Sequence, residues 1–359
     1  MKFLLHVVLY CISLTLLSVC GLYYPPMSSS KWEETTVEGL GWNTSAVEPL
    51  LQFLNVTNTK AFIVLKDGKI VLENYFDDFQ SNDNWYWNSA GKVLTTALTG
   101  ICQQEGHCKL QNKVSEYCGS GWTSAPSEKE NLITLQHLLS MTSGLEENGI
   151  SLDPEDLTYK HDAGEVWDYQ NVFYKLIDVI VNATSTSGTV DRDDVLNMYN
   201  RYNDEKLKTK IGMNGRFLED ISGRIIYWSD ARSMARYGIL SLSKGRWNDE
   251  VIIDEQYFSE SITQSQEMNQ AYGYLWWLNG HDSYITPLST SVDGPLVPSA
   301  PADAYFGMGH NTQRLHIVPS LGVVVVRLGN AWHEDDIGYA VSLYDDLLWK
   351  NHLNHLIVA

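Results

Sequence analysis

The strongest constraint on the fold is that β-type segments lie near both ends of the chain, with helical periodicity between them. The β-rich segments are 61–66, 69–75, 272–278, 314–319 and 323–328. Asp67-Gly68 separates the first two and predicts a hairpin turn, whereas the apolar, β-branched run at 323–328 is typical of a central strand. The pattern predicts an α+β fold in which both ends of the chain complete one sheet and a mostly helical region is inserted.

The first twenty residues have the features of a processing signal. Lys2 precedes an apolar stretch at 3–19, and Ser18 and Cys20 provide small residues for cleavage before Gly21. A stretch of about 17 residues is short for a membrane span. We therefore expect an exported protein, periplasmic or secreted. An uncleaved anchor and a lipid anchor on Cys20 are the alternatives.

The rest of the chain divides by composition and periodicity. Residues 21–43 are rich in Pro and Ser at their start and predict a flexible lead-in. Residues 44–359 predict a single domain, with the sheet region at about 44–100 and 225–359 and the helical region at about 101–224. No segment after the signal is long and apolar enough to cross a bilayer, so we expect no transmembrane span in the mature chain.

The charge of the chain limits its partners. The net charge is −19, from 25 Lys and Arg residues against 44 Asp and Glu residues. Because phosphate binding needs a basic surface, nucleic acid is not an expected partner. No Cys/His cluster has metal-ligand spacing and no H-E-x-x-H motif occurs, so we expect neither a metal nor another cofactor. The sequence leaves the oligomeric state open.

Three cysteines follow the signal: Cys102, Cys108 and Cys118. An odd number in an exported chain predicts one disulfide and one buried thiol. Cys108 and Cys118 flank a loop, and we expect them to pair. Cys102 lies in an apolar helical stretch and is expected in the core.

Ser89 begins an apolar helical stretch behind the predicted hairpin, and Lys92 follows it at helical spacing. Residues three apart share a helix face, with Cβ atoms about 5–6 Å apart, so the lysine can reach the serine hydroxyl. A serine needs a base to become a nucleophile, and burial would lower the pKa of Lys92 toward that role. Two further Ser/Lys pairs have the same spacing but do not begin an apolar helix behind a hairpin. On spacing alone, the alternative that Ser89 only caps the helix therefore stays open. These pairs are Ser28/Lys31 and Ser241/Lys244.

Four ordered stretches, within roughly 45–330, resemble the motifs of the beta-lactamase-related serine hydrolases, which include class C beta-lactamases, D-alanyl-D-alanine carboxypeptidases and esterases. Ser89-Ala90-Gly91-Lys92 is similar to Ser-x-x-Lys, and residues 133–145 resemble the Ile-Thr-x-x-x-Leu-Leu-x-x-Thr-Ser-Gly-Leu stretch. Tyr169-Gln170-Asn171 is similar to Tyr-x-Asn, and residues 309–313 lie where the third motif belongs. The resemblance implies a beta-lactamase or penicillin-binding-protein transpeptidase-like fold, with an antiparallel sheet flanked by helices in one catalytic domain.

The resemblance also implies roles for the matching residues. Ser89 would be the nucleophile and Lys92 its base. Tyr169 would share the role of base and later protonate the leaving group, which requires that a cation such as Lys92 lowers the pKa of the phenol. Asn171 would orient Lys92 and the substrate amide, and His310 stands where relatives carry Lys or His.

The residues after His310 depart from the family pattern. Asn311 and Thr312 stand where relatives have Thr-Gly or Gly-Gly. Since the glycine lets a substrate lie close to the strand, its loss argues against beta-lactamase activity. We expect Thr312 or Gln313 to supply a second oxyanion donor, without deciding between them. The expected substrate is a small ester or amide, then a peptide with D-residues, and a beta-lactam last. The rival is a catalytically silent binding protein on the same scaffold.

Overall fold

A six-stranded sheet is the centre of the molecule. The structure is a computed structural model that describes residues 21–27, 31–149, 152–185, 190, 192–220, 223–333, 341 and 343–358. The strand order is β10-β13-β14-β15-β1-β2, and every neighbouring pair is antiparallel. The strands are β1 (Thr59–Lys66), β2 (Lys69–Tyr75), β10 (Trp277–Leu278), β13 (Tyr305–Gly309), β14 (Gln313–Val318) and β15 (Val323–Gly329). The chain therefore has the predicted α+β architecture, with strands from both ends in one antiparallel sheet.

The predicted hairpin and central strand are both present. Asp67 and Gly68 join β1 to β2 with positive φ angles of 48° and 83°, as a tight hairpin turn requires. Every residue of β15 is buried, because β15 lies between β14 and β1. The predicted strand at 272–278 is shorter than expected, since only its last two residues pair with β13.

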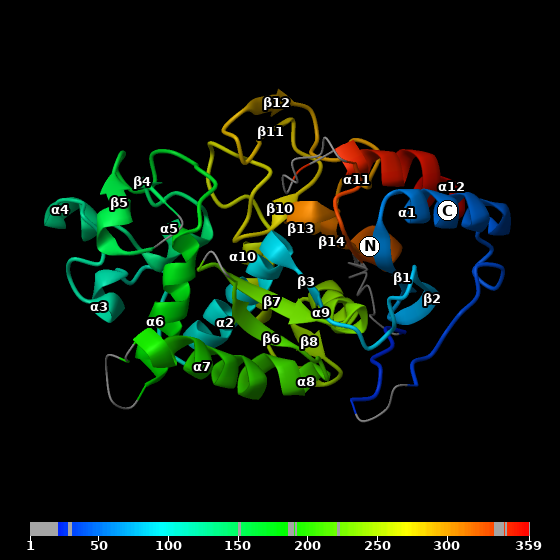
Figure 1. Ribbon diagram of the computed structural model, residues 1–359, viewed down its shortest axis with the longest axis horizontal. Helices are drawn as coiled ribbons and strands as arrows, with labels where there is room; N and C mark the ends of the chain where they lie inside the picture. Colours follow the sequence, from blue (N-terminus) through cyan, green and yellow to red (C-terminus); the bar gives the residue numbers. More distant parts are fainter. Residues whose placement is uncertain are drawn as a thin grey trace, which may run out of the picture.

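Helices cover both faces of the sheet. On one face, α9 (Ala231–Leu242) packs against β1, β14 and β15. On the other face, Asp345 of α11 (Leu343–Leu348) contacts two buried side chains of β14, Arg314 at 2.7 Å and His316 at 2.9 Å. Arg314 and His316 are two residues apart and so share a face of the strand. Figure 1 shows α12 (Asn354–Leu356) beside α1 (Val47–Val56), which brings the two ends of the domain together.

The remaining elements surround the sheet, mostly in the segment between α2 and β7. The helices are α2 (Lys92–Gln104), α3 (Ser115–Cys118), α4 (Ser127–Glu130), α5 (Leu135–Leu139), α6 (Lys175–Thr184), α7 (Arg192–Asn203), α8 (Thr209–Ile211) and α10 (Glu255–Ser261). The short strands are β3 (Trp85–Tyr86), β4 (Leu145–Glu147), β5 (Leu157–Tyr159), β6 (Arg216–Glu219), β7 (Ile225–Ser229), β8 (Arg246–Trp247), β9 (Glu250–Val251), β11 (Ser283–Ile285) and β12 (Ser291–Asp293). Of these, β3, β7 and β6 form one small sheet, and the others pair as hairpins.

The expectation of a flexible lead-in at 21–43 is corrected for the described residues of that segment. The Tyr23 amide donates to the Asp67 carbonyl at 2.9 Å, and the Trp32 indole donates to the Gly68 carbonyl at 2.7 Å. Trp32 is buried against the core. Backbone pairing and aromatic burial therefore hold this segment against the β1–β2 hairpin. The predicted signal, residues 1–20, lies outside the described residues.

The predicted pairing of Cys108 with Cys118 is also corrected. Both are free thiols, as is Cys102. Cys108 is buried against the end of α2, where its thiol meets that of Cys102, whereas Cys118 lies on α3 beside charged residues of α6. The loop between Cys108 and Cys118 therefore carries its two sulfurs to different places. Cys102 is in the core, as predicted.

Candidate active site

Ser89 lies in a short 3-10 turn, Asn88–Gly91, that leads directly into α2. The buried residue Trp87 fixes the start of this turn, because its amide donates to the Tyr227 carbonyl at 2.9 Å and its indole donates to the Ser229 hydroxyl at 2.8 Å. Lys92 is the first residue of α2, and its Nζ donates to the Ser89 Oγ at 3.2 Å. The structure therefore brings together the predicted nucleophile and base, with the Ser89 side chain partly exposed.

The ammonium group of Lys92 is held in a buried, aromatic environment. Its Nζ lies 4.3 Å from the ring centre of Phe173 and 5.1 Å from that of Tyr169. Burial lowers the pKa of Lys92 to about 7, although the nearby carboxylate of Glu147 opposes this shift. An amine with a pKa near 7 is substantially neutral at neutral pH and can accept a proton.

Tyr169 is placed at the nucleophile, but its acidity differs from the expectation. Its hydroxyl hydrogen-bonds to Ser89, and its ring stacks on Trp277 at a centroid distance of 5.8 Å. Burial raises the pKa of Tyr169 to about 12, and the bond to Ser89 only partly counters that rise. The phenol therefore keeps its proton at neutral pH, which leaves Lys92 as the group able to act as the base.

Asn171 contacts a carboxylate that the sequence analysis did not identify. Its Nδ2 donates to Glu147 Oε2 at 3.4 Å, and the Val172 amide donates to the other carboxylate oxygen of Glu147. Burial raises the pKa of Glu147, while these hydrogen bonds and the charge of Lys92 lower it. The Glu147 carboxylate therefore contacts Asn171 and also acts on the pKa of Lys92. Its position two residues after the Thr-Ser-Gly-Leu stretch was the only sequence signal for it.

That Thr-Ser-Gly-Leu stretch supports the segment that carries Tyr169. The Asp168 amide donates to the Met141 carbonyl at 3.0 Å, and the Ser143 hydroxyl donates to the side-chain oxygen of Gln170 at 3.1 Å. Gln170 in turn donates to the Leu145 carbonyl. These contacts fix the backbone on both sides of Tyr169. The Thr-Ser-Gly-Leu stretch therefore positions Tyr169 next to Ser89.

The His310 segment is the three-residue turn between β13 and β14. The Asn88 side chain donates to the His310 carbonyl at 2.9 Å, which connects this turn to the turn Asn88–Gly91 that carries the predicted nucleophile, called the nucleophile turn below. The His310 side chain is exposed, whereas the Thr312 hydroxyl is buried and makes no hydrogen bond. The Gln313 side chain is buried and donates to the Gly329 carbonyl at 2.6 Å. That bond holds the Gln313 side chain inside the sheet, so its amide group is not available to a ligand.

Two glycines in β13 allow this hairpin to lie directly on the nucleophile turn. A Cβ atom on Gly309 would come within 2.4 Å of the Trp87 carbonyl oxygen and 2.9 Å of the Ala90 amide nitrogen. A Cβ atom on Gly307 would meet the Ala90 carbonyl oxygen at 3.3 Å. The strand and the turn therefore touch through their backbones at Gly309, where no side chain would fit.

A cluster of three aromatic side chains lies beside the His310 turn. Trp85 stacks on Tyr86 at a centroid distance of 4.8 Å, and Tyr86 meets Trp228 edge-on at 5.4 Å. All three side chains are half-buried, and the Asn311 side chain donates to the Tyr86 hydroxyl at 3.0 Å. Tyr86 thus lies beside the His310 turn, with Trp85 and Trp228 packed against its ring.

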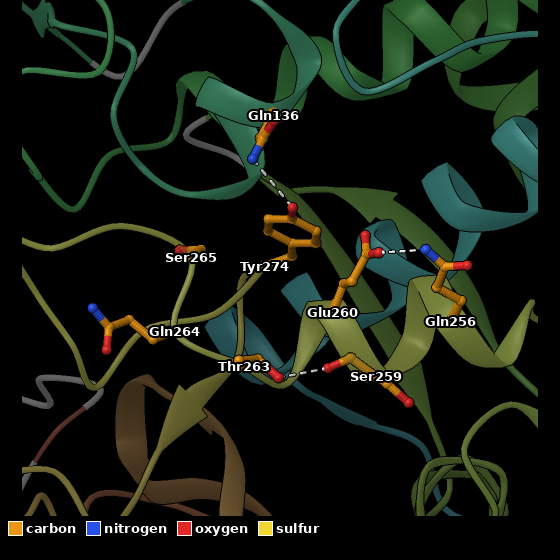
Figure 2. Close-up of a pocket in the computed structure, with 8 residues that line it drawn as sticks. All are labelled: Gln136, Gln256, Ser259, Glu260, Thr263, Gln264, Ser265 and Tyr274. Carbon is orange, nitrogen blue, oxygen red and sulfur yellow. Dashed lines mark hydrogen bonds between the residues drawn. The ribbon is translucent and has the colours of Figure 1, made fainter.

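A surface cavity of about 390 Å³ lies apart from these residues, between α5 and α10 (Figure 2). Its lining is made of amide, hydroxyl and carboxylate side chains, such as Gln136, Glu260 and Tyr274. Gln136 donates to the Tyr274 hydroxyl at 3.3 Å across its rim. The volume suits a small ligand, but the lining holds no lysine or arginine and none of the predicted site residues. We therefore assign the candidate chemistry to the Ser89 region.

The described residues contain no group of His, Cys, Asp or Glu side chains arranged to hold a metal ion. Within the same part of the chain, no helix has the length and apolar character needed to span a membrane.

Comparison with known proteins identifies the family of the chain. A family model described as Beta-lactamase matches residues 56–344. The chain belongs to the Beta-lactamase family. No curated protein matches it in sequence. Among solved structures, a Bacillus anthracis protein provisionally assigned as a 6-aminohexanoate-dimer hydrolase is 18% identical, with a TM-score of 0.68 over 94% of this chain and 91% of that one.

Two further solved structures share the fold of this Beta-lactamase family member. A beta-lactamase from Mycobacterium bovis is 16% identical, with a TM-score of 0.56 over 86% of this chain and 100% of that one. An octameric penicillin-binding protein homologue from Pyrococcus abyssi is 15% identical, with a TM-score of 0.59 over 86% of this chain and 77% of that one. At these identities the likeness concerns the fold.

Proposed function

We propose that this chain is a serine hydrolase that forms an acyl-enzyme on Ser89 and hydrolyses a small ester or amide. The observation that carries the proposal is the 3.2 Å contact between Ser89 Oγ and the Nζ of Lys92, an amine whose burial brings its pKa to about 7. A neutral amine at hydrogen-bond distance is what a serine needs to become a nucleophile.

The proposed reaction proceeds in two balanced steps. In the first, the Ser89 proton passes to Lys92 while Oγ bonds to the substrate carbonyl carbon, and the leaving group departs with a proton relayed through the Tyr169 hydroxyl. In the second, water loses a proton to the same groups and attacks the acyl carbon, which releases the acid and restores Ser89. We place the oxyanion between the amides of Ser89 and Gln313, because β14 starts against the nucleophile turn.

The half-buried aromatic side chains beside the His310 turn favour an apolar acyl or leaving group. Thr312 replaces the glycine of the related motif, so a peptide with D-residues ranks below a simple ester or amide, and a beta-lactam ranks last. The apolar stretch at 3–19 supports export, as part of the same proposal.

Labelling with a fluorophosphonate, followed by mass-spectrometric mapping, tests the proposal. We expect one adduct, on Ser89, and a loss of reporter-ester turnover of about 1,000-fold or more in Ser89→Ala. Ser241→Ala is the matched control: it removes the serine of the Ser241/Lys244 pair, whose hydroxyl donates to the Tyr237 carbonyl at 2.8 Å inside α9. This control should keep both the adduct and the turnover.

The rival is a binding protein without catalysis. It is supported if Ser89 takes no adduct and Ser89→Ala turns over the reporter as fast as the unaltered chain. If Ser89 is labelled, a panel of a reporter ester, a D-amino amide and a cephalosporin ranks the substrate classes. Fastest turnover of the cephalosporin would contradict the substrate order proposed here.

A further inference from the structure

The thiols of Cys102 and Cys108 meet at the C-terminal end of α2. The chain turns back after α2. As a result, the amides of His107 and Cys108 both donate to the Cys102 carbonyl, at 3.0 and 3.4 Å. Cys108 Sγ is 3.9 Å from the carbonyl of Thr99, which is one helical turn before Cys102. Both side chains are almost fully buried, and the neighbouring Cys108 thiol is the main cause that raises the pKa of Cys102.

This geometry suits a covalent bond between the two sulfurs. A disulfide needs Cα atoms about 4.4–6.8 Å apart, with the two side chains directed at each other. The backbone contact between Cys108 and Cys102 keeps the two residues close, and the Cys108 thiol points back along α2 to the Thr99 carbonyl, one turn before Cys102.

Cys118 has different surroundings. It ends α3, and the charged groups that act on it are Asp178 and Lys175 of α6, together with Glu130. The chain thus carries one converging pair of thiols and one separate thiol, which agrees with one disulfide but with a partner other than the one the sequence suggested.

We propose that Cys102 and Cys108 form a disulfide that closes the segment 103–107 at the end of α2. In the reaction, one cysteine thiolate attacks a small disulfide such as oxidised glutathione and expels one glutathione thiol. The second cysteine then displaces the attached glutathione, so that two cysteine thiols and one oxidised glutathione give one protein disulfide and two glutathione thiols. Because both sulfurs are buried, the exchange takes place before folding is complete.

The disulfide would anchor the far end of the helix that begins at Lys92. It fixes the turn after α2 without touching Ser89, Tyr169 or the His310 segment. The proposal therefore stands independently of the hydrolase proposal, and its test needs no substrate.

Differential alkylation of the full chain, refolded from its reduced form in a glutathione redox buffer, tests the bond. The refolded chain is quenched in acid, denatured, treated with iodoacetamide and digested with trypsin. Cleavage after Lys92 and Lys109 places both cysteines in one peptide, 93–109, and the peptide 114–129 carries Cys118. We expect peptide 93–109 to be unalkylated and about 2 Da lighter than its reduced form, because two hydrogens leave when the bond forms. It should gain two carbamidomethyl groups only after reduction, whereas 114–129 should be alkylated without reduction.

Two results would overturn the proposal: two carbamidomethyl groups on 93–109 before reduction, or a cross-link between 93–109 and 114–129. Cys118→Ser is the matched control and should leave the 93–109 pattern unchanged. Cys108→Ser should make Cys102 alkylatable without reduction. If Cys108→Ser does not fold, the map of the unaltered chain decides the question by itself.

Discussion

At the scale of single residues, the site depends on two buried groups whose pKa values move in opposite directions. Burial lowers the pKa of Lys92 to about 7 and raises that of Tyr169 to about 12. The same desolvation acts on both, since it disfavours the ammonium in one case and the phenolate in the other. In the proposed reaction, Lys92 is therefore the proton acceptor and the Tyr169 hydroxyl the proton relay.

Glu147→Gln should move the pH dependence of the reaction to lower pH. The Glu147 carboxylate favours the charged form of Lys92 and so raises its pKa, and its removal lowers that pKa further. In the proposed reaction neutral Lys92 is the base, so the rate at which Ser89 reacts should rise with pH through about 7 in the unaltered chain. We expect the midpoint to fall by about 1 pH unit in Glu147→Gln, measured as fluorophosphonate labelling rates from pH 5 to 9.

The control for this change is the neighbouring carboxylate. Glu146 pairs with Lys160 at 3.2 Å on the other side of the strand, where both side chains are well exposed. Glu146→Gln should leave the midpoint in place. A midpoint that stays fixed or rises in Glu147→Gln would show that Glu147 does not support the charge of Lys92.

The sequence predicted the residues that have a motif and missed those defined by burial. Ser89, Lys92 and Tyr169 stand in motif positions, and the structure places them in contact. In the sequence Glu147 follows Glu146, and two adjacent glutamates are typical of a solvent-exposed acidic segment. Its burial results from the approach of residues 171 and 172 to β4, a long-range contact that no local pattern carries.

At the scale of elements, the site is the meeting point of α2, the Tyr169 segment and the β13–β14 hairpin. The sequence predicted the first two and did not predict β13. Glycine is depleted in strands, and β13 has glycine at two of its five positions. The same glycines are required by the structure, because β13 lies against the backbone of the nucleophile turn. The two glycines therefore made β13 hard to predict from the sequence, and they also allow it to lie against this turn.

Gly309→Ala should lower activity strongly. Its new Cβ atom would lie 2.4 Å from the Trp87 carbonyl oxygen, so the hairpin and the nucleophile turn must separate. A displacement of about 1 Å at a catalytic site can reduce the rate about 100-fold, and we expect a loss of that size in kcat/KM for a reporter ester. Gly307→Ala is the milder companion, because its closest contact is 3.3 Å. Equal activity of Gly309→Ala and the unaltered chain would show that this contact does not position the site.

At the scale of the whole molecule, the buried base reduces the stability of the fold. Lys92 has a folded pKa of about 7 against an unfolded value of 10.5. Between these values the unfolded chain binds more protons than the folded one, so folding stability rises with pH, by at most about 1.4 kcal/mol per pH unit. The protein therefore keeps a lysine in its core at a thermodynamic cost, as functional sites often do.

Lys92→Met should abolish activity and stabilise the fold at neutral pH. Methionine fills a similar space without a charge to desolvate, so we expect a gain in the free energy of unfolding of a few kcal/mol, at most about 4 kcal/mol, at pH 7. The gain should shrink as the pH rises toward 10, as measured by urea denaturation at pH 7, 8 and 9. Lys244→Met, at an exposed position, is the control and should change little. A less stable Lys92→Met at pH 7 would mean that Lys92 is charged and stabilising in the fold.

The pairing of β1 with β15 limits how early in folding the candidate site can form. Ala61 lies opposite Leu328, so the sheet joins segments from nearly opposite ends of the chain. A contact of such long sequence separation forms late and slowly, because a very large loop must close first. Ser89 is synthesised well before the β13–β14 hairpin that lies against its turn. A chain synthesised only as far as α10 therefore carries Ser89 without the β13–β14 hairpin, so the proposed acyl transfer must wait until that hairpin has been made and has folded.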